Sequence, residues 1–194
     1  YYLEITFFNI LRFKKKLSRF LMSFTIGLDI STSCTGICVL SADGNLKILT
    51  HLKYPSKLSL WAKADLTRQN LVALVEQYDL EISDFFVEES LQKFRPGLSS
   101  AKTLTTLSKF NGIVCYLGRE VLGLDPMSIN VNAARKTVGL KIPRGSNAKD
   151  IVHSWVSEET SYDWPTKILK SGPRKGREVM LNECYDMADA YLIA

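Results

Sequence analysis

The sequence predicts an α/β fold: a mixed β-sheet, with three antiparallel strands followed by parallel strands, flanked by helices. Two observations predict it. Three apolar segments follow one another with only short turns between them, which indicates an antiparallel meander. Beyond them, segments with apolar residues at helical spacing alternate with short apolar runs. The resulting order β-β-β-α-β-α-β-α-α is typical of a sheet covered by helices.

The strands are recognised as apolar runs bounded by turn residues. The meander is expected over residues 24–30, 36–40 and 46–52. Phe85-Phe86-Val87 forms the next strand, and it is too apolar for an exposed sheet edge. A further short strand is expected over 128–131.

Helices are expected where apolar residues recur at helical spacing. The predicted segments are 60–78, 99–122, 133–138 and 148–156, with a last helix that includes Asp186 and Asp189. That helical pattern still continues at Ala194, so we expect the sequence to be a fragment. Residues 158–181 contain two prolines and two glycines, which predicts a mobile loop or small excursion.

Composition limits the class of protein. The chain has 194 residues, of which 46% are hydrophobic and 23% charged, as in a globular domain. No run of 18 apolar residues occurs, so we predict no membrane span. The four cysteines form no CxxC pair and no dense disulfide framework, which favours a reducing compartment such as the cytoplasm.

Positive charge is concentrated at two places. The net charge is +5, and residues 1–21 hold five bases against one acid. We expect these residues to be a basic N-terminal extension that is not native, with Met22 as the true start of a domain over 22–194. A basic arm that contacts membrane or nucleic acid is the alternative. Residues 135–177 hold ten bases and four acids, which indicates either an anionic partner or a solvated face.

Acidic residues occur where burial makes them costly. Asp29 ends one apolar strand, and Glu88 with Glu89 ends another. Asp186 and Asp189 are spaced i and i+3, so they share one face of the last helix. A cluster of these carboxylates would need a divalent cation, and oxygen ligands suit Mg²⁺ or Mn²⁺.

Two such ions can hydrolyse a phosphodiester without a histidine, cysteine or serine nucleophile. Each acid also has a structural interpretation. Asp29 could cap the turn at residues 31–33, the glutamates could pair with lysines, and the helix aspartates could face solvent.

These acidic segments resemble a known family. Gly27-Leu28-Asp29-Ile30-Ser31 with Thr35-Gly36-Ile37-Cys38-Val39-Leu40 resembles the first motif of RuvC-type Holliday junction resolvases, which have a ribonuclease H-like fold. Phe86-Val87-Glu88-Glu89 is similar to their second acidic strand, and Asp186-Met187-Ala188-Asp189-Ala190 to their last helix. The resemblance covers about residues 24–194, lapses over 158–181, and suggests a divergent phage or viral member.

The resemblance implies a DNA-cutting enzyme. Asp29, Glu88, Asp186 and Asp189 would hold two Mg²⁺ ions, with Mn²⁺ as a substitute, and Lys149 would join them in catalysis. Hydrolysis of a four-way junction or other branched DNA would leave a 5′-phosphate and a 3′-hydroxyl. Residues 100–114 would form a homodimer, which matches the symmetry of a junction. The residues implied to bind DNA are Arg135, Lys136, Lys149, Arg174 and Lys175.

Other functions fit parts of the same pattern. Gly27-Leu28-Asp29-Ile30-Ser31-Thr32-Ser33 also resembles the first phosphate loop of actin-like sugar kinases, although 194 residues leave no room for their second domain. A non-catalytic DNA-binding relative is a further alternative. A related nuclease acting on flaps, forks or RNA–DNA hybrids is the third.

Overall fold

The main sheet of this protein has five strands in the order β3-β2-β1-β4-β5. The computed structural model describes residues 23–89 and 100–194, so the predicted N-terminal extension and Met22 lie outside the described residues. β1 pairs antiparallel with β2, and β2 with β3, whereas β4 runs parallel to β1, and β5 to β4. The predicted mixed sheet is therefore confirmed. The strand bounds are β1 Ser23–Ile30, β2 Cys34–Ser41, β3 Leu46–Lys53, β4 Glu81–Glu88 and β5 Met127–Ile129.

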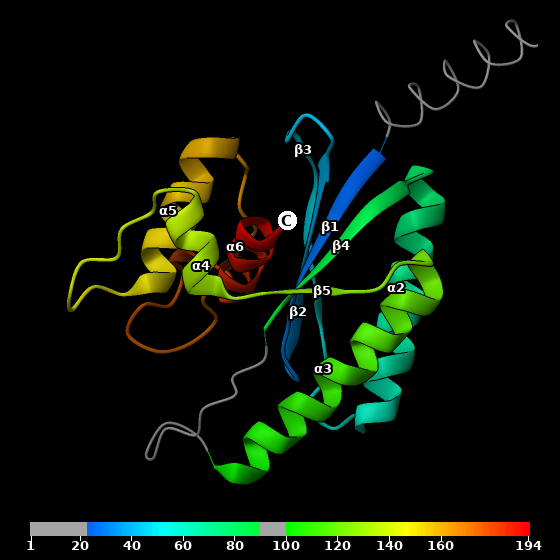
Figure 1. The fold of residues 1–194 in the computed structure, drawn as a ribbon. Helices are drawn as coiled ribbons and strands as arrows, with labels where there is room; N and C mark the ends of the chain where they lie inside the picture. Colours follow the sequence, from blue (N-terminus) through cyan, green and yellow to red (C-terminus); the bar gives the residue numbers. More distant parts are fainter. Residues whose placement is uncertain (1–22, 90–99) are drawn as a thin grey trace, which may run out of the picture.

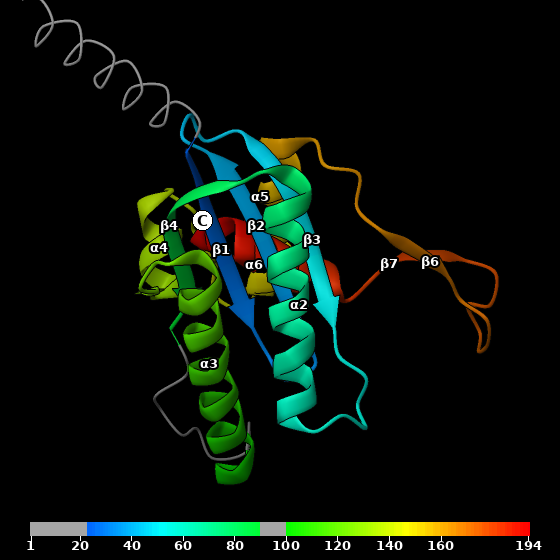
Figure 2. The same cartoon turned by 90° about the vertical axis from the view of Figure 1, so that its right-hand side faces the viewer.

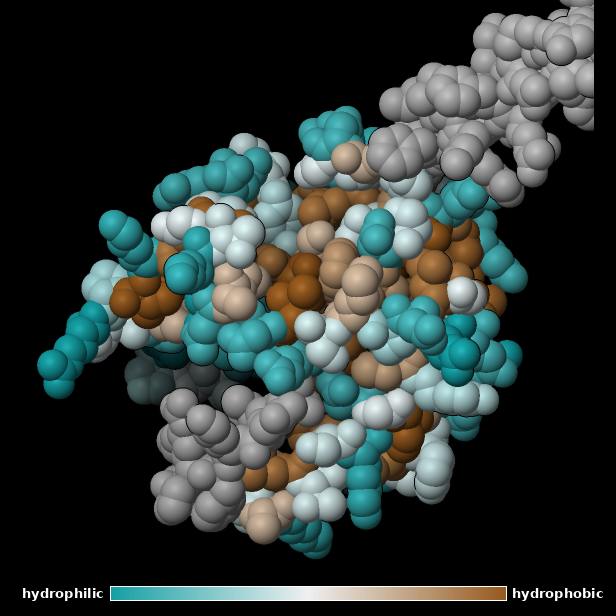
Figure 3. Space-filling model, viewed as in Figure 1, coloured by the Kyte–Doolittle hydropathy of each residue, from teal (hydrophilic) through white to brown (hydrophobic). Residues whose placement is uncertain are grey.

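Helices cover both faces of the sheet (Figures 1 and 2). Two of them, α2 and α3, pack together on one face, and α6 lies on the other face with α5 and α4 outside it. Hydrophilic side chains predominate on the outer surface around α4 and α5 (Figure 3). None of the helices in the described ranges is long and apolar enough to span a bilayer. The helix bounds are α2 Leu60–Tyr78, α3 Ala101–Leu122, α4 Val131–Thr137, α5 Ala148–Thr160 and α6 Glu183–Ile193.

Alternation along β1 separates the core from the functional face. Ile26, Leu28 and Ile30 belong to the apolar cluster under α2 and α3. Because side chains alternate along a strand, Gly27 and Asp29 face the other way, toward α6. A buried carboxylate at the end of β1 is thus held on the face that carries the last helix.

Two glycines allow α6 to lie unusually close to the sheet. A Cβ on Gly36 would overlap the Asp186 carbonyl oxygen, and one on Gly27 would stand 2.6 Å from the Ala190 carbonyl oxygen. Real Cβ atoms do not approach backbone this closely, so α6 sits where only glycine permits it. This contact fixes the height of Asp186 and Asp189 above β1 and β2.

Residues 158–181, for which a mobile loop or small excursion is expected, contain regular secondary structure. Residues 158–160 complete α5, and the rest forms a second, two-stranded sheet from β6 (Thr166–Ile168) and β7 (Glu178–Met180). The strands pair antiparallel with Lys167 opposite Val179. Prolines and glycines in this segment mark the turn of a hairpin.

Candidate active site

A cleft of about 280 Å³ opens where β1, β4 and α6 meet. It gathers side chains from both faces of the fold, because α3 contributes to its wall as well as α4, α5 and α6. All four predicted metal-binding acids border it. The lining residues are Asp29, Ile30, Ser31, Glu88, Glu89, Leu107, Asn111, Arg135, Lys149, Asp186 and Asp189.

Asp29 and Glu88 are brought together by parallel strand pairing. Leu28 pairs with Val87, so the next residue of each strand lies at the same sheet edge and on the same face. Burial, the negative charge of Glu88 and a hydrogen bond between the two carboxyl groups raise the pKa of Asp29 well above its ordinary value. Burial beside a second carboxyl group therefore disfavours the charged form of Asp29.

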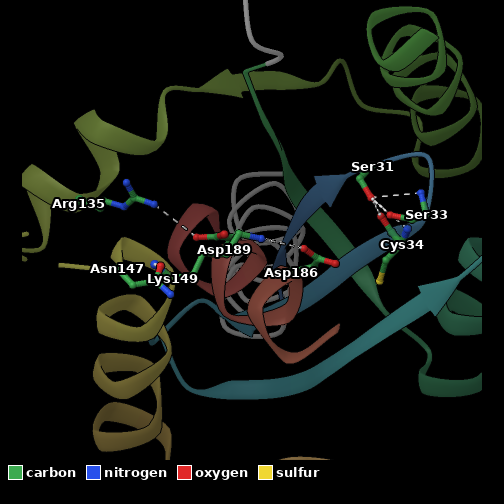
Figure 4. A network of polar contacts seen from close by, with 8 residues as sticks. All are labelled: Ser31, Ser33, Cys34, Arg135, Asn147, Lys149, Asp186 and Asp189. Atoms are coloured by element: carbon green, nitrogen blue, oxygen red, sulfur yellow. Dashed lines mark hydrogen bonds and ion pairs between the residues drawn. The ribbon is translucent and has the colours of Figure 1, made fainter. Parts of the chain in front are cut away.

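Asp186 and Asp189 point into the cleft from successive turns of α6. Burial and the Glu88 charge raise the pKa of Asp189 to about 6, although Lys149 and Arg135 act against this rise. Arg135 Nη2 lies 3.7 Å from Asp189 Oδ1, and Lys149 Nζ lies 3.5 Å from Asp186 Oδ1 (Figure 4). Two basic side chains therefore offset part of the acidic charge.

The turn after β1 is held by serine rather than by Asp29. Ser31 Oγ accepts hydrogen bonds from the backbone N–H of Cys34 and Ser33 and donates to the Cys34 carbonyl oxygen at 2.8 Å (Figure 4). The alternative role of Asp29 as the cap of this turn is thus not what the described residues show. Burial and the nearby Asp186 carboxylate, to which the thiol is hydrogen-bonded, raise the pKa of Cys34, so this side chain is a neutral donor.

Lys149 is positioned by the start of α5. Asn147 caps that helix by accepting from the Lys149 backbone N–H. The ammonium group lies 5.9 Å from the centre of the Tyr185 ring, and the Tyr185 hydroxyl donates to Asp150 at 2.6 Å. These contacts place the ammonium group over α6 beside Asp186.

Two buried polar atoms of this cleft lack hydrogen bonds within the described residues, Asp189 Oδ1 and Arg135 Nε. The Arg135 guanidinium, 3.7 Å from Asp189 Oδ1, forms an ion pair with it but is too distant for a hydrogen bond. A buried carboxylate oxygen in this state would gain from a closer cation or donor. The donor chemistry therefore fits a hard divalent cation.

The acids are not yet arranged around such an ion. Across the described ranges, no group of three or more histidine, cysteine or acidic side chains is placed to hold a metal ion as it stands. Lys149 and Arg135 form ion pairs with two of the carboxylates. Ion binding would require these ion pairs to loosen.

The remaining predicted residues lie outside the cleft. Lys136 borders a neighbouring basic pocket that also contains Arg135 and Lys141. Arg174 and Lys175 belong to the β6–β7 connection, and neither lines the cleft. Glu89 does line it, and its carboxylate accepts a hydrogen bond from the Asn130 amide at 3.0 Å.

Three residues of the site had no sequence signal. Leu107 and Asn111 line the cleft from α3. Cys34 contacts Asp186. A single leucine, asparagine or cysteine follows no diagnostic spacing, because its role comes from the approach of distant elements.

Comparison with known proteins identifies the fold. No family model and no curated protein matches the sequence. The solved structure of T. thermophilus RuvC in complex with a Holliday junction substrate matches with a TM-score of 0.58 and 14% identity, covering 88% of this chain and 91% of that one. The chain has the RuvC fold. A second Thermus thermophilus RuvC structure agrees, with a TM-score of 0.55, 16% identity and coverage of 87% and 92%.

The RuvC fold confirms the expected ribonuclease H-like architecture. With sequence identities of only 14% and 16%, the similarity to these proteins is one of fold alone. The roles of the cleft residues therefore depend on their own geometry. The phage or viral character expected from the sequence remains a prediction.

Proposed function

We propose that this protein is a divalent-metal-dependent endonuclease that hydrolyses phosphodiester bonds in branched DNA, with the four-way junction as its substrate. One observation carries the proposal. Asp29, Glu88, Asp186 and Asp189 come from three separate elements and border one cleft with Lys149 and Arg135 beside them. Carboxylates gathered under basic side chains suit a reaction on a phosphate group.

Each group has a defined task in this reaction. Asp29, Glu88, Asp186 and Asp189 would hold two Mg²⁺ or Mn²⁺ ions, which would supply water activation and stabilisation of the leaving oxygen. A cation bound beside Asp29 would favour its charged form and so oppose the rise in its pKa. Lys149 and Arg135, released from Asp186 and Asp189, would then face the substrate phosphate and stabilise its added negative charge.

The substrate class is supported by shape and symmetry. The T. thermophilus RuvC structure of the same fold holds a Holliday junction substrate. A four-way junction presents two equivalent strands, so two copies of this chain would match it as a homodimer. Recognition would depend on phosphate contacts and branch geometry.

A junction cleavage assay tests the proposal. Purified protein with a labelled four-way junction and Mg²⁺ or Mn²⁺ should give symmetric nicks with 5′-phosphate and 3′-hydroxyl ends. A linear duplex of the same sequence, a flap, a fork and an RNA–DNA hybrid should be cut at least 10-fold more slowly. Absence of nicks in the junction with either metal would overturn the proposal.

The Asp29→Asn variant separates cleavage from binding. It should abolish cutting and weaken Mn²⁺ binding measured by calorimetry, while junction binding is retained, because the substitution removes an ion ligand and leaves the basic residues in place. Asp65→Asn, an exposed change on α2, is the matched control and should cut normally. Cutting by Asp29→Asn at the normal rate would remove Asp29 from the site.

A further inference from the structure

Among the elements that the structure describes, the β6–β7 hairpin is strongly basic and lies outside the cleft. Between Thr166 and Met180 it carries five bases and a single acid, Glu178. All five bases are exposed. They are Lys167, Lys170, Arg174, Lys175 and Arg177.

None of these five bases forms an ion pair with any residue in the part of the chain that the structure describes. The one acid of the hairpin, Glu178, instead accepts a hydrogen bond from the Thr166 hydroxyl across the two strands. The positive charge is therefore left for an external partner. A solvated surface usually mixes both signs, which this element does not.

The turn that carries the bases is ordered by its own backbone. Gly176 N–H donates to the Leu169 carbonyl oxygen at 2.8 Å, and Lys175 N–H donates to that of Gly172 at 3.0 Å. Arg177 N–H donates to the Arg174 carbonyl oxygen at 3.1 Å. Bases held on such a scaffold lose less conformational freedom on binding than bases on a disordered tail.

The base of the hairpin is fixed to the nuclease body. Trp164 Nε1 donates to Ser157 Oγ on α5 at 2.8 Å, and its ring packs against that of His153 at a tilt of 44°, with centroids 4.3 Å apart. Leu181 N–H bonds to the Pro165 carbonyl oxygen at 3.0 Å, and α6 begins two residues later. The hairpin is thus joined directly to α5 and to the start of α6, the helix that bears Asp186 and Asp189.

The hairpin also stands apart from the cleft. Figure 2 shows it as an arm that extends past the β3 side of the sheet, clear of the body. No hairpin residue lines the cleft. A duplex held there would be gripped away from the strand being cut.

We propose that this hairpin is a second DNA-binding surface, which grips the phosphate backbone of one duplex arm while the cleft holds the branch. The inference rests on the proposed function, since it assigns the arm of the same substrate to a separate surface. The chemistry it recognises is the regular phosphate array of double-stranded DNA, without base readout.

Neutralising the tip of the hairpin tests this assignment. In an Asp29→Asn background with Mg²⁺, K170Q/R174Q/K175Q should bind a four-way junction with long arms on the order of 10- to 100-fold more weakly, because three phosphate contacts are lost. The slope of log affinity against log salt should fall by about 2 to 3. K47Q/K57Q/R68Q removes equal charge from β3, the segment after it and α2, and should change both quantities much less. Equal thermal melting of the variants excludes unfolding.

Arm length gives an independent measurement. The unaltered hairpin should favour arms of about 25 base pairs over arms of about 8, which span only about 27 Å at 3.4 Å per base pair. K170Q/R174Q/K175Q should abolish that preference. The hairpin assignment would be overturned if K47Q/K57Q/R68Q lost as much junction affinity as K170Q/R174Q/K175Q. It would also be overturned if K170Q/R174Q/K175Q still preferred the longer arms. Loss of binding to anionic vesicles but not to DNA would also overturn it.

This outcome is separate from the fate of the proposed function. Suppose that the protein cleaves short-armed junctions in a metal-dependent way, and that K170Q/R174Q/K175Q binds junctions as tightly as the unaltered hairpin. That result would overturn the hairpin assignment and leave the proposed nuclease function standing. Absence of any junction cleavage by the unaltered chain would sink the nuclease proposal, whatever the hairpin binds.

Discussion

The aspartates of the cleft are held at an energetic cost in the metal-free protein. Asp29 is 9% exposed and Asp189 only 6%, so water does little to solvate their charges. Burial accordingly raises the pKa of Asp29, and Arg135 offsets part of the cost at Asp189. Strain of this kind is typical of residues kept for a ligand, because folding alone would favour neutral side chains.

Removing one of these charges should stabilise the metal-free protein. A pKa raised from 3.8 to about 6 corresponds to on the order of 3 kcal/mol at pH 8, at 1.36 kcal/mol per pKa unit. Asp189→Asn should therefore raise the free energy of unfolding by about 1 to 3 kcal/mol, because the lost contact with Arg135 offsets part of the gain. Urea unfolding with and without chelator measures it.

The pH dependence of that gain has a fixed sign. A carboxyl with a raised folded-state pKa stabilises the protein below its unfolded pKa and loses that contribution as the pH rises through about 6. The advantage of Asp189→Asn should thus be full at pH 8 and vanish toward pH 4. Saturating Mn²⁺ should reverse the order of stability. An advantage that grew on acidification would contradict the assigned cause.

At the scale of elements, the contact between α6 and the β1–β2 pair controls the site. Gly36→Ala would force its Cβ against the Asp186 backbone, so α6 must move outward or tilt. We expect a loss of about 2 to 4 kcal/mol in unfolding free energy, as for overpacked cores, together with loss of Mn²⁺ binding. Calorimetry and thermal unfolding of the purified variant measure the two effects.

Gly112→Ala is the matched control for that substitution. Gly112 lies in α3, and a Cβ added there would meet no atom within 4 Å, so alanine should stabilise the helix by roughly 0.5 to 1 kcal/mol. Normal stability and Mn²⁺ binding in Gly36→Ala would show that the helix does not depend on this close approach.

Most elements could be predicted from the sequence because apolar spacing determines them locally. The strand before Glu88 follows from a short apolar run, and the helix that carries Asp186 from helical spacing. Acids at the ends of two strands and on one face of that helix predicted the acidic lining of the cleft. The β6–β7 hairpin could not be predicted, because its strands are only three residues long and lack a buried face. Short pairing of this kind depends on the turn between the strands.

Long-range contacts escaped prediction for a different reason. Lys63 lies on a helix with charged neighbours, yet it is 8% exposed and its Nζ donates to the Thr32 carbonyl oxygen at 2.7 Å. Tyr54 likewise hydrogen-bonds both Thr35 and Thr67. These contacts join α2 to the β1–β2 turn, and they arise only when the helix packs on the sheet. A local pattern therefore carries no trace of them.

At the scale of the whole molecule, the described residues of one chain form one cleft lined by the four acids, and this sets the stoichiometry of the proposed reaction. A junction has two strands to cut, so the proposed resolution would require two such clefts. The predicted homodimer would use the α3 side, which reaches the cleft through Leu107 and Asn111. Dimer contacts on α3 would then set the distance and the orientation between the two clefts.

A mixing experiment tests this whole-molecule prediction. Analytical ultracentrifugation of the purified, unaltered protein should give a molecular mass twice that of one chain, as expected for the homodimer. On a supercoiled plasmid with an extruded cruciform, the unaltered protein should make two cuts and release linear DNA. An equal mixture with Asp29→Asn should form linear product with only about a quarter of the dimers, because random pairing gives one fully active dimer in four. Linear product in proportion to active chains would mean that monomers act alone, since a paired inactive cleft would otherwise leave only a nick.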